Sequence, residues 1–108
     1  MAYRLDPGQH GTLGDYLTNG QVTLTLETTG DLVLRQEGVE NSLWHTDTAG
    51  TGVSGATMRQ DGIFELEWGI WTTPTLSPRA YLFVHPNGFV AIYSEDDSLL
   101  WYRPKPVR

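Results

Sequence analysis

The chain has 108 residues, which is enough for one domain with a single hydrophobic core. Thirteen acidic and seven basic residues give a formal net charge of −6, which argues against binding nucleic-acid phosphates or docking on an anionic membrane. The absence of cysteine excludes a disulfide framework and a thiolate nucleophile. No apolar run approaches the roughly 18 residues of a membrane span, and the first residues show no signal peptide. We therefore expect no nucleic-acid partner and no membrane insertion.

Short alternations of apolar and polar residues, together with twelve glycines, predict an all-β domain. The first clear alternation covers residues 21–27, where Val22, Leu24 and Leu26 are expected on one face of a strand and the residues between them on the other. A tight turn follows at residues 29–31. The next two expected strands are residues 32–35 and 42–46.

This pattern of a hairpin and a following strand returns twice along the chain. The second copy predicts strands at 56–60, 63–67 and 70–72. The third copy predicts strands at 81–85, 89–93 and 99–101. One such sheet cannot bury its apolar face alone, whereas three sheets facing one another can. We therefore predict a single domain over 1–108, with three antiparallel sub-sheets around a pseudo-threefold axis and repeats at roughly 17–48, 56–75 and 80–103.

Each predicted hairpin has a glycine in its turn and a tryptophan some ten residues later. The turn glycines are Gly30, Gly62 and Gly88. The tryptophans that follow them are Trp44, Trp71 and Trp101. Because these three indoles occupy corresponding places in the repeats, they are expected to meet in the core near the axis, with a sugar-stacking role as the alternative. Trp68 lies in a shortened connection and is a candidate for exposure.

These repeats resemble the bulb-type, or monocot mannose-binding, lectin family. The resemblance covers nearly the whole chain. Three kinds of feature carry it: an opening stretch, turns of the Asp-Gly-Asn kind, and segments of the Ile-Trp-Ala-Ser-Asn-Thr kind. In chain order they are residues 11–17 with Gly20, residues 30–34, 43–48, 61–62, 70–75 and 87–88. The resemblance implies the β-prism II fold, a non-enzymatic carbohydrate-binding function and no cofactor.

The family's mannose site is Gln-x-Asp-x-Asn-x-Val-x-Tyr, whose alternate residues point to one face of a hairpin. Carried over to the first hairpin, the motif falls on Glu27, Thr29, Asp31, Val33 and Arg35. In the second hairpin it falls on Arg59, Asp61, Ile63, Glu65 and Glu67. In the third it falls on His85, Asn87, Phe89, Ala91 and Tyr93. Since no copy keeps the full set, the resemblance implies sugar-binding motifs that are degenerate.

The first hairpin keeps the most groups able to hold a sugar. We expect a carbohydrate site for mannose-type glycans at Glu27, Asp31, Val33 and Arg35, with recognition that is weakened or altered. The alternative for this face is a solvated strand surface with an ion pair between strands. Lesser pockets are expected at Asp61 in the second hairpin and at Asn87 and Tyr93 in the third.

The third hairpin places apolar bulk where the family has hydrogen-bonding groups. An outward strip of His85, Phe89, Ala91 and Tyr93 is expected to meet a second subunit, a partner protein or a sugar face. By resemblance, a homodimer is expected through the C-terminal strand, which ends at residues 103–106, where Pro104 and Pro106 would stop further pairing. The alternative function is therefore a lectin fold that has lost sugar binding and acts through protein contacts.

Other chemistry finds little support in the sequence. Glu65 and Glu67 share a strand face, which leaves a two-carboxylate glycosidase as a third alternative. Residues 50–55 match G-x-G-x-x-G, but a strand is expected after them rather than the helix of a dinucleotide site. The three histidines are far apart in sequence, so we expect no metal site and no catalytic residues.

Overall fold

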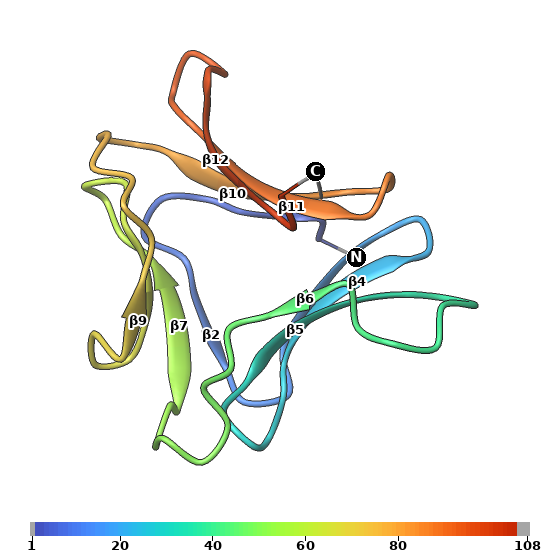
Figure 1. Cartoon of the computed structure of the whole chain (residues 1–108). Coiled ribbons are helices and arrows are strands. Elements are labelled where there is room, and N and C mark those ends of the chain that lie inside the picture. Colours follow the sequence, from blue (N-terminus) through green and yellow to red (C-terminus); the bar gives the residue numbers. More distant parts are fainter. Residues whose placement is uncertain (1, 106–108) are drawn as a thin grey trace.

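The computed structural model describes residues 2–105 of the chain, so Pro106, part of the expected C-terminal stop, lies outside them. Twelve strands in this range form three antiparallel sheets of four strands each, set around a central axis like the faces of a triangular prism (Figure 1). No helix occurs between residues 2 and 105, and so no helix there is long and apolar enough to cross a membrane. The all-β class and the three sub-sheets around an axis are confirmed.

We name the sheets after the predicted repeats. The first sheet contains, in spatial order, β3 (Tyr16–Asn19), β4 (Val22–Leu26), β5 (Leu32–Gln36) and β6 (Trp44–His45). The second contains β2 (His10–Thr12), β7 (Gly55–Met58), β8 (Phe64–Leu66) and β9 (Trp71–Thr72). The third contains β1 (Arg4–Leu5), β10 (Tyr81–His85), β11 (Phe89–Tyr93) and β12 (Leu99–Arg103).

The N-terminal segment supplies one edge strand to every sheet. β1 pairs with β10 in the third sheet, β2 with β7 in the second, and β3 with β4 in the first. The sequence patterns predicted none of these three strands, because strands of two to four residues are too short to show a clear alternation. This threading ties the three repeats together, since the sheets cannot separate without losing a strand.

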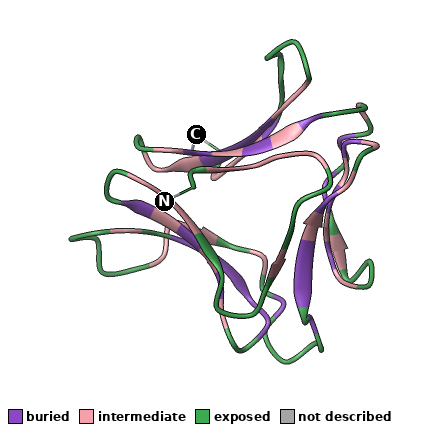
Figure 2. Ribbon diagram, turned by 180° about the vertical axis from the view of Figure 1, so that it is seen from behind, coloured by how far each residue is buried: buried purple, intermediate pink, exposed green. Residues whose placement is uncertain are grey.

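One register row of each sheet faces the axis and builds the core. In the first sheet the row is Leu17, Leu24, Leu34 and Trp44. In the third sheet it is Leu5, Leu82, Ile92 and Trp101. In the second sheet it is Gly11, Ala56, Leu66 and Trp71. In Figure 2 the buried stretches lie along the strands of the three sheets. Because side chains alternate along a strand, the residues next to each inward row point outward.

The three tryptophans at the ends of these rows meet one another. The ring centroids lie 5.7 Å apart for Trp44 and Trp71, 5.8 Å for Trp44 and Trp101, and 5.9 Å for Trp71 and Trp101. All three belong to the core or pack against it. Their predicted convergence is confirmed, and so is the suspected exposure of Trp68, which is 85% exposed.

The hairpin turns need their glycines. Gly62 has a φ of 96°, and a Cβ added there would lie 2.0 Å from the carbonyl oxygen of Ser77, so no other residue fits. A threonine hydroxyl from the segment after the next strand but one closes the turn: Thr75, after β9, donates to the Gly62 carbonyl at 2.6 Å, as Thr48, after β6, does to the Gly30 carbonyl at 2.7 Å. Thr48 and Thr75 each lie four residues after the tryptophan of their repeat, and the residue four after Trp101 is Lys105. This threonine hydrogen bond is therefore a feature of the first two repeats.

Candidate functional site

The outer face of the first sheet carries a polar hollow of about 480 Å³. It lies over β3, β4 and β5 and is bounded on one side by the loop that follows β5. Its lining includes Thr18, Thr23, Thr25, Arg35, Gln36 and Glu40. Thr23 and Thr25 point outward because the alternate residues of β4 are buried in the core. The hollow is thus built from the solvent-facing side of a strand whose other side is apolar.

The hydroxyl groups in the hollow are ordered by one another and by the backbone. Thr18 Oγ1 lies 3.0 Å from Thr23 Oγ1 and donates to the carbonyl oxygen of Val22 at 3.1 Å. With its proton used in that bond, the Thr18 oxygen accepts from Thr23. A hydroxyl also keeps acceptor capacity while it donates, so the pair can still receive a hydrogen bond from a ligand.

Arg35 connects this hollow to the predicted motif. Its Nη2 lies 3.2 Å from Oε2 of Glu27, and both side chains are partly exposed. Arg35 is paired in register with Thr23, whereas Glu27 stands near the turn, so their ion pair crosses the row of Thr25 and Val33 between them. Val33 is only 3% exposed and offers no open surface to a ligand in this arrangement.

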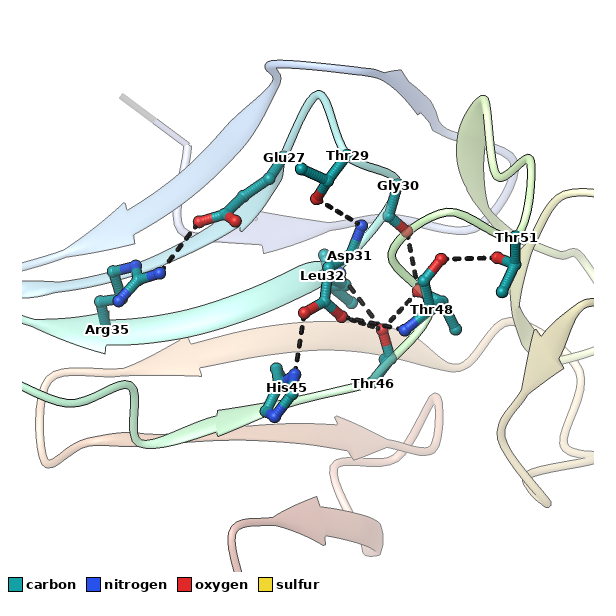
Figure 3. A network of polar contacts seen from close by, with 10 residues as sticks. All are labelled: Glu27, Thr29, Gly30, Asp31, Leu32, Arg35, His45, Thr46, Thr48 and Thr51. Atoms are coloured by element: carbon teal, nitrogen blue, oxygen red, sulfur yellow. Dashed lines mark hydrogen bonds and ion pairs between the residues drawn. The ribbon is translucent and has the colours of Figure 1, made fainter.

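Asp31 is held inside a hydrogen-bond network at the turn (Figure 3). Its Oδ2 accepts from His45 Nδ1 at 2.8 Å, and its Oδ1 accepts from Thr46 Oγ1 at 3.0 Å and from the Thr48 amide at 3.2 Å. Burial alone would raise the pKa of Asp31, but the hydrogen bonds from His45, Thr48 and Thr46 outweigh it and lower the pKa. The carboxylate therefore ties β6 and the segment after it to the turn before β5.

Charged side chains on the second hairpin are engaged by neighbouring groups of the same sheet and its loops. Arg59 Nη2 lies 2.6 Å from Asp61 Oδ2, and Asp61 Oδ1 accepts from the Ile63 amide at 3.3 Å. Burial alone would raise the pKa of Asp61, but the hydrogen bonds from the Ile63 amide and from Arg59 together outweigh it and lower the pKa. Glu67 lies 3.3 Å from His10 Nδ1 and accepts from Ser54 Oγ at 3.2 Å, so of the two carboxylates in the glycosidase alternative, one is already engaged.

The third hairpin carries an aromatic cluster that largely covers itself. His85 stacks on Phe89 with ring centroids 4.0 Å apart, and its Nε2 lies 2.7 Å from the Tyr93 hydroxyl. Ala91, beneath them, is fully buried, whereas Asn87 is exposed in the turn. Burial lowers the pKa of His85. Tyr81 joins the cluster, and burial together with Asp97 raises its pKa to about 12.

The predicted site residues thus fall on three separate faces. The structure brings Glu27, Val33 and Arg35 together on the first sheet, beside Asp31. It leaves Asp61 on the second sheet and Asn87 with Tyr93 on the third. Among residues 2–105 no group of three or more metal-ligating side chains comes together.

Residues of the hollow itself were missed in the motif-based prediction. Thr18, Thr23 and Thr25 belong to no family motif, although the alternation of 21–27 already turned the two β4 threonines outward. Residues 36–40 line the hollow from a loop, and strand periodicity does not give the position of a loop. The signal that could have found the site is the row of threonines opposite a leucine row.

The fold is that of several solved lectin structures. A lectin from Gastrodia elata, described as monomeric, monocot and mannose-binding, is 23% identical with a TM-score of 0.85, covering 98% of this chain and 100% of that one. The chain has the β-prism II lectin fold. The Japanese Marasmius oreades lectin is 21% identical with a TM-score of 0.83, over 95% of this chain and 91% of that one. The Colocasia esculenta agglutinin with mannose bound is 22% identical with a TM-score of 0.73, over 94% and 93%.

No protein-family model and no curated protein sequence matches the chain. At identities below 25%, the likeness of this β-prism II domain to the solved lectins establishes the fold, while the ligand has to be argued from the residues on its three faces.

Proposed function

We propose that this β-prism II domain is a bulb-type lectin that binds mannose-type glycans, with altered recognition, through the outer face of its first sheet. The polar hollow beside Arg35 carries the proposal. Its volume of about 480 Å³ falls within the roughly 300–1,000 Å³ that is usual for small-molecule sites. It adjoins the hairpin on which the family's mannose motif falls, and solved lectins of the same fold are described as mannose-binding.

The groups around the hollow suit a polyhydroxylated ligand. The guanidinium of Arg35 supplies hydrogen-bond donors, and the carboxylate of Glu27 supplies acceptors beyond the one oxygen lying 3.2 Å from Arg35. Thr18 and Thr23, whose hydroxyls contact each other, line the hollow. Sugar hydroxyls both donate and accept, so each can bond to one group of either kind.

The recognition differs from the family motif in two respects. Asp31 keeps its carboxylate in the network with His45, Thr46 and Thr48, and Val33, in the row that the Glu27–Arg35 pair crosses, is buried. We propose that the ligand lies toward Thr18 and Thr23 rather than over Val33. Binding through exposed polar groups alone, with little apolar contact, is expected to be weak, in the range of about 1 mM.

Replacing Arg35 by alanine tests this site. A charge-assisted hydrogen bond contributes about 1.5–3 kcal/mol, so Arg35→Ala should weaken binding of methyl α-mannoside about tenfold or more. Arg59→Ala is the matched control, because Arg59 is a partly exposed arginine on the second sheet that also pairs with a neighbouring carboxylate. Isothermal titration calorimetry of both variants decides. No binding of mannosides or other glycans by the unmodified chain, or equal loss in both variants, contradicts the proposal.

A second candidate function, favoured by a different observation, is protein contact through β12. This strand is an edge of the third sheet, and Leu99 and Leu100 on it are 52% and 40% exposed. Edge strands with exposed apolar side chains are surfaces on which a second chain can pair. We propose that two copies of the chain associate there as a homodimer.

Light scattering tests the association. The unmodified chain should have the mass of a dimer, and Leu100→Asp should have that of a monomer. Leu76→Asp is the control, since Leu76 is 75% exposed but lies outside β12. A monomer at all concentrations contradicts the proposal.

A further inference from the structure

A cavity of about 120 Å³ lies within the prism at one end of the core. Side chains from all three sheets line it, among them Leu5 and Leu82 from the third, Leu17 and Leu24 from the first, and Ala56 and Phe64 from the second. Its exposed lining residues, His10, Asp15 and Tyr16, belong to the edge strands β2 and β3 and the connection between them. The cavity therefore has an apolar interior and a polar mouth.

The cavity arises where the second sheet breaks the pseudo-threefold pattern. The first sheet places Leu17 and Leu24 at the first two positions of its inward row, and the third sheet places Leu5 and Leu82 there. The second sheet has Gly11 and Ala56 at these positions. Glycine and alanine in place of two leucines leave out about seven side-chain carbon atoms, and a folded chain closes over such a loss only in part.

Backbone geometry does not demand glycine at position 11. Gly11 has none of the positive φ values that mark the turn glycines. A Cβ added there would meet only Asp15, at 3.7 Å, which is an ordinary contact distance. A larger side chain is therefore compatible with the strand, and the space next to Gly11 is open rather than filled from another sheet.

We propose that this cavity binds a compact, uncharged, apolar molecule of about seven carbon atoms, such as a methyl-substituted aromatic ring. Apolar cavities of about 150 Å³ lined by leucine, isoleucine and phenylalanine stay dry and take up benzene or xenon. The interior here is likewise lined by leucine and phenylalanine, with alanine and glycine in place of isoleucine; it opens at the polar mouth and has slightly less volume. A charged ligand is disfavoured in the interior, because leucine and phenylalanine side chains do not replace its hydration, and the polar residues His10 and Asp15 stand at the exposed mouth. The site is separate from the polar hollow, so it stands or falls independently of glycan binding.

Toluene is the probe that tests the cavity in the intact chain. In ¹H–¹⁵N spectra it should shift the amides of Gly11, Ala56 and Phe64 and leave those around Arg35 unchanged. The midpoint temperature of thermal unfolding should rise by about 4 °C when the concentration of free toluene is about five times its dissociation constant. An absence of toluene-dependent shifts in the unmodified chain overturns the proposal.

Filling the cavity provides the matched variant. Ala56→Leu restores the residue type found at this position in the other two sheets, and should weaken toluene binding about tenfold or more. Ala49→Leu is the control, because Ala49 is exposed in a loop and should leave binding unchanged. If Ala56→Leu does not fold, Gly11→Ala takes its place, since the added Cβ enters the cavity with contacts no closer than 3.7 Å. Toluene binding that is equally tight in the filled variant overturns the proposal.

Discussion

The first and third sheets have the same kind of residue row facing the axis, but the outer face of the first sheet is polar and that of the third is aromatic. Each inward row has three aliphatic side chains followed by a tryptophan. On the outer faces, the register puts Thr23 and Arg35 of the first sheet where the third has Tyr81 and Tyr93. The first face is polar and hollowed, whereas aromatic rings pack against one another on the third.

The two faces nevertheless share one structural device. Glu27 and Arg35 form an ion pair across the first face, and His85 and Tyr93, at the corresponding positions, lie 2.7 Å apart across the third. The residue between the two partners is buried in both cases: it is Val33 on the first face and Ala91 on the third. The comparison teaches that the inward rows maintain the fold, while the outward rows can change from polar to aromatic without altering it.

The largest expected loss of stability comes from replacing Trp101, an inward residue of the third sheet that also contacts the tryptophan of the first. Trp101→Ala should lower the free energy of unfolding by about 3–5 kcal/mol, because it leaves a cavity where the three indoles meet. Trp68→Ala, at a position 85% exposed, should change it by about 0.5 kcal/mol or less. Urea denaturation measures both. Similar losses for the two variants would show that the tryptophans do not hold the three sheets together.

A smaller loss of stability is expected when Asp31 is replaced in the turn of the first hairpin, a position that the motif gives to Phe89 in the third hairpin. Asp31→Ala leaves His45, Thr46 and Thr48 without their acceptor, and should cost about 1–3 kcal/mol. Because the pKa of Asp31 is lowered on folding, its contribution is complete above its unfolded value of 3.8 and is lost as the pH falls below that value.

Chemical denaturation at pH 6 and pH 3 measures the contribution of Asp31. The gap between the unmodified chain and Asp31→Asn should be narrower at pH 3, because below pH 3.8 the unfolded chain binds a proton at Asp31 that the folded carboxylate binds less readily. A gap of equal size at both pH values would mean that the charge of Asp31 does not contribute to the turn.

Exchanging outward residues between the two faces should affect binding more than stability. Thr23→Tyr places the third sheet's residue in the hollow and should weaken mannoside binding about tenfold or more by filling the space a sugar would occupy. The converse exchange, Tyr81→Thr, should leave binding unchanged. Calorimetric titration of the two variants compares them directly, and undiminished binding by Thr23→Tyr would place the ligand elsewhere.

The smallest expected effect concerns the pH response of the third face. Burial lowers the pKa of His85, so the folded chain holds it neutral at pH values where the unfolded chain is protonated. Stability should therefore decline as the pH falls below the unfolded value of about 6.5. The decline in Tm from pH 7.5 to pH 5.5 should be smaller in His85→Gln than in the unmodified chain, by the equivalent of about 1 kcal/mol or less. An identical decline would show that His85 is not its source.

The sequence allowed prediction of the features that repeat. Trp44, Trp71 and Trp101 were predicted to converge because each follows a hairpin of the same pattern, and the inward leucines of β4 followed from simple alternation. β1, β2 and β3 were not predicted, because strands of two to four residues show too little of a period. Each repeat therefore gained a fourth strand that local patterns did not reveal.

The candidate site was predictable only in part. The motif placed Glu27 and Arg35 on one hairpin, and their side chains do meet across it. The engagement of Asp31 depends on the pairing of β5 with β6, which brings His45 and Thr46 to its carboxylate from fourteen and fifteen residues away. The hollow depends on where the loop at 36–40 lies over the sheet. Both are tertiary features that residue spacing does not encode.

The most direct test of the central claim is a titration of the ¹⁵N-labelled chain with methyl α-mannoside, followed by ¹H–¹⁵N spectra. We predict saturable shifts that gather at the amides of Thr18, Thr23, Thr25 and Arg35, with those of the third sheet unmoved. An absence of saturable shifts, or shifts confined to the aromatic face around His85 and Tyr93, would contradict the claim that the first sheet binds the sugar.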